Sequence, residues 1–211
     1  MKSLYLLTCC LLLASCTPPQ ASNSGVYMLI DTSGTYAQEI TKAEQIIRYT
    51  LSRLDATDSF AVARIDTASF SEKDIVVKMT FDDRPSTINR QKRQFAEQIQ
   101  DFVSDTKSSP YTDISGGLLQ AIEYLNEKGP AVKTVLIFSD LKEELQEGYI
   151  REFEFDLTGF DVIALNVTKL RSDNVDPREY LARLDEWQDK IEKSGGSWRV
   201  INDLDGLEDL L

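Results

Sequence analysis

The sequence predicts an α/β protein with a doubly wound, mostly parallel sheet and one antiparallel edge strand. Short, continuously apolar segments, such as residues 26–30 and 135–138, have the composition of strands that are covered on both faces. They alternate with longer segments whose apolar residues recur every three or four positions, as in amphipathic helices. Because strands that alternate with helices form βαβ crossovers, we expect helices on both faces of the sheet.

The first half of the expected domain supplies the edge of the sheet. After the strand at residues 26–30, residues 38–54 carry a helical stripe of apolar side chains. Residues 60–65 and 74–80 read as two strands, with Ser71-Glu72-Lys73 as the hairpin turn between them. A hairpin joins antiparallel strands, so it predicts the single antiparallel edge strand.

The second half repeats the alternation of helix and strand, without an internal sequence repeat. Gly129-Pro130 and Gly195-Gly196 are placed to end two of its helices. We expect Trp187 and Trp198 to pack in the core. The expected elements are a helix from Pro85 through Phe95, Ile99 and Phe102, a helix at 114–125, strands at 135–138 and 161–167, a long helix through Tyr180, Leu184, Trp187 and Ile191, a strand at 198–201 and a weak helix at 204–211.

Residues 1–15 are predicted to be a lipoprotein signal peptide. Lys2 precedes an apolar run at residues 4–14, which is shorter than the about 20 residues of a spanning helix. Leu13-Ala14-Ser15-Cys16 resembles the bacterial lipobox, in which the cysteine thiol receives a diacylglycerol and becomes the mature N-terminus. The alternative is an ordinary signal peptide with an incidental cysteine. Cleavage before Cys16 removes the other two cysteines and leaves no intrachain disulfide, which favours acylation.

The predicted lipid anchor places the protein in the bacterial cell envelope. Residues 16–25 form an acylated cysteine and a flexible tether rich in Pro, Ser and Asn, and residues 26–211 form one domain. Two or three acyl chains would bind a membrane firmly. Thr17 follows the cysteine, at the place where Asp usually retains such lipoproteins at the inner membrane, so in a cell with two membranes we expect the outer one.

The charge of the chain argues against nucleic acid as a partner. The net charge is −12, with 23 basic and 35 acidic residues, and it becomes −13 once Lys2 leaves with the signal peptide. Phosphate binding needs lysine and arginine to displace counterions. The one basic cluster, Arg90-Gln91-Lys92-Arg93, lies at a helix start and is expected to be solvated.

Oxygen-bearing side chains follow two of the expected strands. Asp31, Ser33 and Thr35 follow the first strand, Asp140 follows the strand at 135–138, and Thr112 precedes a helix. In open parallel sheets, ligands bind at the carboxyl ends of the strands where the strand order reverses. Asp, Ser and Thr oxygens suit Mg²⁺, Mn²⁺ or Ca²⁺ better than Zn²⁺ or copper. The structural alternative is that these residues only form turns and helix caps.

The order of these residues resembles the metal-ion-dependent adhesion site of von Willebrand factor A domains. The resemblance rests on Asp31-x-Ser33-x-Thr35, Thr112 and Asp140, covers essentially residues 26–211, and implies the doubly wound fold. It implies that the hydroxyls of Ser33, Thr35 and Thr112 contact a divalent metal, first of all Mg²⁺, with Mn²⁺ or Ca²⁺ as alternatives. It also implies that Asp31 and Asp140 bind the metal directly or through water, and that the metal accepts an Asp or Glu side chain of a partner protein.

Two residues depart from the pattern of this family. Thr35 stands where Ser is more common, which keeps the oxygen and adds a methyl group. Leu141 stands where a glycine commonly follows the final aspartate, so the shape of that loop is open at this point. Neither departure removes a metal ligand.

The sequence predicts a binding module and no enzyme. It contains no histidine, which excludes Ser-His-Asp and Cys-His catalysis and HExxH zinc sites, and no phosphate-binding GxxxxGK[ST] loop. The alternatives are a structural scaffold of an envelope assembly with metal-independent contacts and, less favoured, a metal-assisted hydrolase. An acidic run at Glu143, Glu144 and Glu147 is expected to be a solvated face, with a rim around the site as the less favoured alternative.

Overall fold

A computed structural model of the chain describes residues 23–34, 36–66, 71–148, 154–170 and 172–203, together with Glu208 and Leu210. Among these residues, none of the helices combines the length and apolar character needed to cross a bilayer. The elements follow one another as β1 (Ser24–Ile30), η1 (Tyr36–Glu39), α1 (Ile40–Arg53), β2 (Ser59–Arg64), η2 (Glu72–Asp74), β3 (Ile75–Thr80), α2 (Pro85–Asp105), α3 (Ile114–Lys128), β4 (Val132–Phe138), β5 (Phe160–Leu165), η3 (Ser172–Asn174), α4 (Pro177–Lys193) and β6 (Ser197–Ile201).

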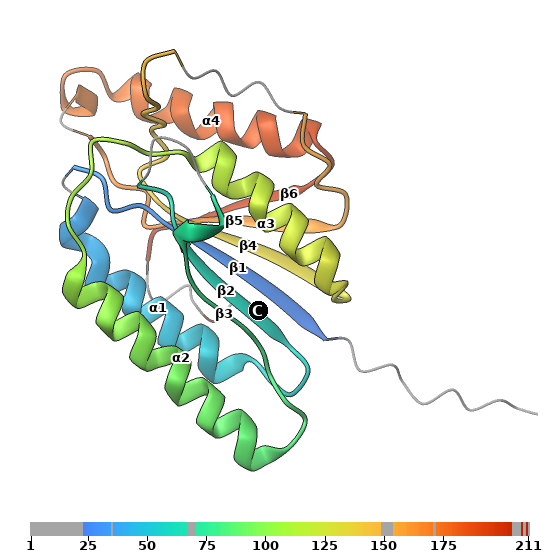
Figure 1. Cartoon of the computed structure of the whole chain (residues 1–211). Helices are drawn as coiled ribbons and strands as arrows, with labels where there is room; N and C mark the ends of the chain where they lie inside the picture. Colours follow the sequence, from blue (N-terminus) through green and yellow to red (C-terminus); the bar gives the residue numbers. More distant parts are fainter. Residues whose placement is uncertain are drawn as a thin grey trace, which may run out of the picture.

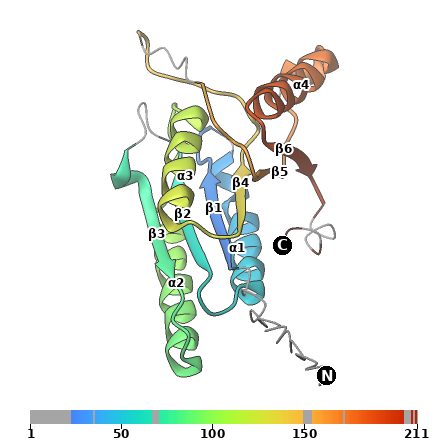
Figure 2. The ribbon, with the colours of Figure 1, turned by 90° about the vertical axis from the view of Figure 1, so that its right-hand side faces the viewer.

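The six strands form one sheet in the order β3-β2-β1-β4-β5-β6. Every neighbouring pair is parallel except β2 and β3, which are antiparallel (Figures 1 and 2). The predicted fold class is therefore confirmed, including the single antiparallel edge strand. The strand order reverses between β1 and β4, so this is the switch point at which open sheets of this kind bind ligands.

Helices cover both faces of the sheet, as the alternation of elements predicted (Figure 1). On one face α1 and α2 pack against β1 and β2, and the ring of Phe60 stacks on that of Phe95 with 4.8 Å between centroids. On the other face α3 and α4 pack against β1, β4 and β5 through buried side chains such as Leu118 and Trp187. Trp198 is half-buried against the same core. Both tryptophans thus pack where the sequence predicted.

Local signals in the sequence set several of the helix ends. Asp113 precedes α3 and its carboxylate accepts a hydrogen bond from the Gly116 amide, which would otherwise lack a partner at the helix start. Pro85 occupies the first turn of α2, where a missing N–H costs nothing. Gly129 ends α3 with φ +60° and Gly195 follows α4 with φ +87°, a left-handed conformation that favours glycine.

The sheet begins earlier than the sequence predicted. Strand β1 starts at Ser24, and the carbonyl of Asn23 accepts hydrogen bonds from the amides of Ala131 and Val132. A Cβ atom on Gly25 would lie 2.5 Å from the Pro130 side chain, so the close approach of the two segments requires glycine there. Residues 23–25 of the predicted tether therefore belong to the folded domain.

Two other predicted elements have different boundaries in the structure, and a third lies mostly outside the described residues. The strand predicted to reach residue 167 ends at Leu165, because Asn166 turns the chain with φ +53°. The predicted hairpin turn at Ser71-Glu72-Lys73 lies in and before the short helix η2, which Ser71 caps. The weak helix predicted at residues 204–211 falls, apart from Glu208 and Leu210, outside the described residues, as do residues 1–22 with Cys16.

Candidate metal centre

The carboxyl ends of β1 and β4 meet at the switch point of the sheet (Figure 1). The two strands are parallel neighbours and Ile30 pairs with Phe138, the last residue of each strand. The Asp31 amide continues the pairing by donating to the Phe138 carbonyl at 2.9 Å. The residues that follow each strand, Asp31 on one and Ser139 and Asp140 on the other, therefore lie at the same edge.

Three segments of the chain converge on the carboxylate of Asp31, which is fully buried. Its Oδ1 accepts hydrogen bonds from the Ser33 amide at 2.7 Å and from the Thr112 hydroxyl at 3.4 Å. Its Oδ2 accepts from the Ser139 hydroxyl at 2.8 Å. The turn after β1, the loop before α3 and the loop after β4 thus meet at one side chain.

The loop that carries Thr112 is held from both sides. The backbone of Thr112 exchanges two hydrogen bonds with that of Glu144, at 2.9 and 3.0 Å, in a short antiparallel bridge. On the other side, the Asp113 amide donates to the carbonyl of Ile65 just beyond β2. The fully buried Thr112 hydroxyl is thereby fixed over the switch point.

The remaining predicted ligands are placed as follows. Asp140 is 9% exposed, and its Oδ1 accepts a hydrogen bond from the Lys142 amide at 2.9 Å. Ser33 is partly exposed, next to Gly34 with φ +48°. Thr35 lies outside the described residues. The structure therefore brings Asp31, Ser33 and Thr112 into one hydrogen-bonded group, with Asp140 at the same edge.

The two carboxyl groups are held where ionisation is unfavourable. Burial raises the pKa of Asp31 to about 6, although hydrogen bonds from Ser33 and Ser139 oppose the rise and the nearby Asp140 adds to it. Burial also raises the pKa of Asp140, against the Lys142 amide and the positive charge of Arg183. Two buried carboxylates so close together are costly at neutral pH, and a divalent cation between them would offset that cost.

The donor set suits a hard cation. Within the described residues, no group of three or more His, Cys, Asp or Glu side chains is placed to hold a metal, so two carboxylates and several hydroxyls are the donors on offer. Carboxylate and hydroxyl oxygens are the kind of ligand that Mg²⁺ prefers. These residues therefore fit a Mg²⁺-type ion in donor chemistry.

Leu141 adopts the backbone conformation of a glycine. Its φ is +67°, in the left-handed region, while its side chain is 1% exposed and packs in the core below the site. The loop after β4 thus keeps the turn that a glycine would allow, at the cost of backbone strain in a leucine. The departure from the family pattern at this position changes the side chain and leaves the loop conformation available.

We expect Leu141→Gly to be more stable than Leu141→Ala, by about 1 kcal/mol. Both variants lose the buried side chain, at about 2–5 kcal/mol relative to wild type. Alanine retains the left-handed strain and glycine does not, so the usual preference for alanine is reversed. Urea unfolding of the two variants measures the difference. A more stable alanine variant would contradict the left-handed conformation of Leu141.

Ser139, beside Asp140 at the end of β4, donates to Asp31 and accepts from the Leu141 amide at 3.0 Å, so it links the two strand ends. Sequence reasoning missed two further contacts, which hold the loop after β4. From α4, Arg183 donates to the Asp140 carbonyl at 3.0 Å and Trp187 to the Leu141 carbonyl at 2.9 Å. The sequence offers no signal for these contacts, because α4 is distant along the chain and its inner face reads as ordinary core.

The acidic run after Asp140 is only in part a solvated face, which corrects the prediction. Glu143 accepts hydrogen bonds from the Ser115 amide at 2.6 Å and hydroxyl at 3.0 Å, at the start of α3. Lys190 lies 3.9 Å from the Glu143 carboxylate and donates to the Ser115 hydroxyl. Glu144 bridges to Thr112, and Glu147 is exposed as predicted. Glu143 therefore satisfies the start of a helix that carries the site.

A cavity of about 510 Å³ lies beside the first motif. Its wall includes Ser109, whose backbone pairs with that of Thr32 and Gly34, and Asp66, which accepts from the Thr32 hydroxyl at 2.7 Å. Arg64 and Phe102 line it as well.

Comparison with known proteins identifies the fold of the chain. No protein-family profile matches the chain, and no curated protein does. Among solved structures, the chain is similar to a von Willebrand factor type A protein from Catenulispora acidiphila, with a TM-score of 0.53 and 16% identity over 90% of this chain and 41% of that one. It is also similar to the pilus adhesin SpaC from Lactobacillus rhamnosus GG in its open conformation, with a TM-score of 0.54 and 12% identity over 90% of this chain and 29% of that one.

The chain therefore has the fold of von Willebrand factor type A domains. It spans less than half the length of either solved chain. At these identities the likeness concerns the fold, while activity and partners have to be argued from the site.

Proposed function

We propose that this chain, which has the von Willebrand factor A fold, is a membrane-anchored module that recognises a partner protein through a metal-ion-dependent adhesion site. Asp31, Ser33, Thr35, Thr112 and Asp140 would hold a divalent cation, Mg²⁺ before Mn²⁺ or Ca²⁺. Such a cation, when bound, supplies a positive centre that can accept a carboxylate oxygen from outside. The role is binding and involves no catalysis.

The observation that carries the proposal is the convergence of three segments on Asp31. A buried carboxylate that receives hydrogen bonds from Ser33, Thr112 and Ser139 is oriented as a metal ligand would need to be. The raised pKa values of Asp31 and Asp140 support the same interpretation, because the folded chain holds two carboxylates in a place that favours a cation. If these residues only formed turns and helix caps, there would be no need to bury two carboxylates at the same end of the sheet.

The lipid anchor and the metal site would lie at opposite ends of the domain. Strand β1 begins at Ser24, where the segment from the proposed acylated Cys16 enters, and ends just before Asp31 (Figure 1). Seven residues of strand separate the two ends, or about 23 Å. The site would therefore lie at the end of the domain farthest from the lipid anchor, and we propose that the anchor lies in the outer membrane of the cell envelope.

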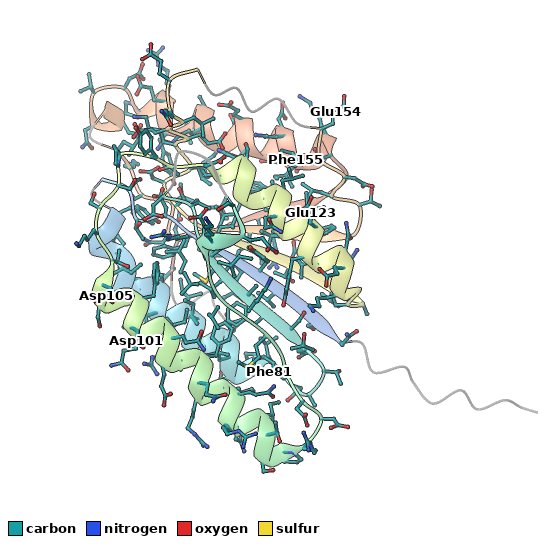
Figure 3. The ribbon with its side chains drawn as sticks, in the orientation of Figure 1. Phe81, Asp101, Asp105, Glu123, Glu154 and Phe155 are labelled. Carbon is teal, nitrogen blue, oxygen red and sulfur yellow. The ribbon has the colours of Figure 1, made fainter. Side chains whose placement is uncertain are left out.

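The charge of the chain constrains the partner. Acidic side chains project from the outer surfaces of the helices, among them Asp101 and Asp105 on α2 and Glu123 on α3 (Figure 3). With a net charge near −13 after removal of the signal peptide, the domain repels acidic surfaces at long range. The partner carboxylate that reaches the metal would therefore be surrounded by basic residues.

The test is whether partner capture depends on the metal. We expect envelope proteins captured by the wild-type chain in Mg²⁺ to be lost both in EDTA and with Asp31→Asn. Titration of the chain with Mg²⁺ and Mn²⁺ by calorimetry measures the metal directly. Capture that survives EDTA and the substitution would contradict the proposal and favour the scaffold with metal-independent contacts, and turnover of generic phosphoesters in Mn²⁺ would favour a hydrolase.

A further inference from the structure

The loop that carries Asp140 contains a strained backbone conformation, which contacts with another element have to stabilise. Leu141 follows Asp140 in the left-handed region with φ +67°, which leucine rarely adopts. The two hydrogen bonds inside the loop, from the Leu141 amide to Ser139 Oγ and from the Lys142 amide to Asp140 Oδ1, involve the N–H groups only. The carbonyl groups of Asp140 and Leu141 are free to be held by another element.

Helix α4 holds both carbonyl groups. Arg183 Nε–H donates to the Asp140 carbonyl at 3.0 Å, and Trp187 Nε1–H donates to the Leu141 carbonyl at 2.9 Å. Residues four apart lie on one face of a helix, so the two donors reach the loop together. These carbonyls belong to the peptide planes on either side of the Leu141 Cα atom. Holding the two planes fixes φ and ψ of Leu141 and, with them, the direction in which the chain leaves Asp140.

The two donors are themselves rigidly placed. Arg183 forms a two-point ion pair with Asp173, with nitrogen–oxygen distances of 3.1 and 2.9 Å, and the Asp173 side chain is fully buried. The Leu170 amide donates to the same carboxylate at 2.7 Å. Trp187 is 4% exposed and packs in the core cluster that contains Leu141. A lysine could not replace Arg183, because only the planar guanidinium reaches Asp173 with two nitrogens and the loop with a third.

We infer that Arg183 and Trp187 are positioning residues for Asp140, and that they set the affinity of the metal centre from α4 without touching the metal. The inference rests on the proposed function, and it adds two residues that the sequence motif does not contain. A glycine after the aspartate would adopt the left-handed turn without strain and would need no such support. With leucine at this position, the contacts from α4 stabilise the turn instead. Loss of an outer partner that orients a metal ligand typically weakens metal binding by about 10–100-fold.

The experiment compares Arg183→Lys and Trp187→Phe with Arg178→Lys in the full chain. Arg178 is the matched control, because it lies on the same helix and pairs with Asp176 at 2.7 Å but is exposed and does not contact the loop. We expect calorimetry to give about 10–100-fold weaker Mg²⁺ binding for Arg183→Lys and Trp187→Phe, and wild-type affinity for Arg178→Lys. The thermal unfolding midpoint in EDTA establishes that each variant is folded at the temperature of the titration.

Amide hydrogen exchange in EDTA adds a readout that does not need the metal. The Leu141 and Lys142 amides should lose at least about tenfold of their protection in the two loop variants and none in the control, because their acceptors move when the loop is released. Unchanged protection and unchanged Mg²⁺ affinity in Arg183→Lys and Trp187→Phe would overturn the inference. A wild-type chain that takes up no Mg²⁺, with exchange responding as expected, would overturn the proposed function and the metal part of the inference while supporting the positioning of the loop.

Discussion

Asp31→Asn is expected to abolish Mg²⁺ binding and, in metal-free buffer at pH 7, to make the fold more stable. Asparagine keeps the size of the side chain and one oxygen for the Ser33 amide, but it removes the charge that a cation needs. The loss of affinity should exceed the about 100-fold that removal of an outer partner costs, because Asp31 is the proposed ligand on which three segments converge.

The gain in metal-free stability follows from the burial of Asp31. Because the pKa of this carboxyl is raised to about 6, the ionised form is disfavoured in the folded state at pH 7. A neutral amide avoids that penalty, so we expect the metal-free variant to be about 1–3 kcal/mol more stable than wild type. Most substitutions of buried residues destabilise, which makes the sign of this change informative. Urea unfolding in EDTA measures it.

The same measurement in Mg²⁺ should reverse the order. Wild type gains about 2.7 kcal/mol when the free metal is 100 times its dissociation constant, and the variant gains nothing. Asp58→Asn is the matched control, because Asp58 is also buried but accepts the Ser24 and Asp55 amides at the opposite edge of the sheet. It should lose stability and keep the metal response. An Asp31→Asn chain that still responds to Mg²⁺ as wild type does would remove Asp31 from the metal centre.

The fold was predictable because each of its elements carries a local signal. Strands β1 and β4 are continuously apolar, since they lie at the centre of the sheet with helices on both faces. Proline and glycine mark several helix ends where their backbone preferences are satisfied, as at Pro85 and Gly129. The start of β1 was missed by two residues, because Ser24 and Gly25 are polar or small and read as tether. Their place in the sheet depends on contacts with Pro130 and its neighbours, far along the chain.

The meeting of the candidate residues at one edge of the sheet was predictable, whereas the contacts that hold their loops were not. Asp31, Thr112 and Asp140 follow or precede elements whose ends must meet once the strands are parallel neighbours. Nothing in the sequence near Arg183 indicates that its guanidinium reaches the Asp140 carbonyl, because that contact depends on how α4 lies over the sheet. The left-handed conformation of Leu141 was not predictable either, because a leucine rarely adopts it and nothing local in the sequence indicates it.

Without metal, the stability of the wild-type chain should fall as the pH rises from 4.5 to 7.5. A carboxyl group whose pKa is raised by folding stabilises the folded chain while it is protonated, and this contribution is lost as the pH rises through the folded pKa. For Asp31 the contribution is fully present below the unfolded pKa of 3.8 and is lost as the pH rises through the folded pKa of about 6. The whole step is about 3 kcal/mol, of which about 2 kcal/mol falls between pH 4.5 and 7.5. Burial raises the pKa of Asp140 as well, so its contribution has the same sign.

The other carboxyl groups with a resolved shift have lowered pKa values, so their contributions rise with pH and do so mainly below about pH 5. Asp173 beside Arg183 has a lowered pKa, so its contribution is present above its unfolded pKa and is lost only as the pH falls below it. Stability measured by urea unfolding in EDTA between pH 4.5 and 7.5 therefore reports mainly on the two buried carboxyls of the site. In Asp31→Asn the slope should flatten, and saturating Mg²⁺ should reverse it in wild type, because the ion binds the ionised carboxylates and releases their protons. A metal-free wild type whose stability stayed level or rose across this range would mean that these carboxyls ionise in the folded chain at least as easily as in the unfolded one, and the case for a cation between them would lose its electrostatic basis.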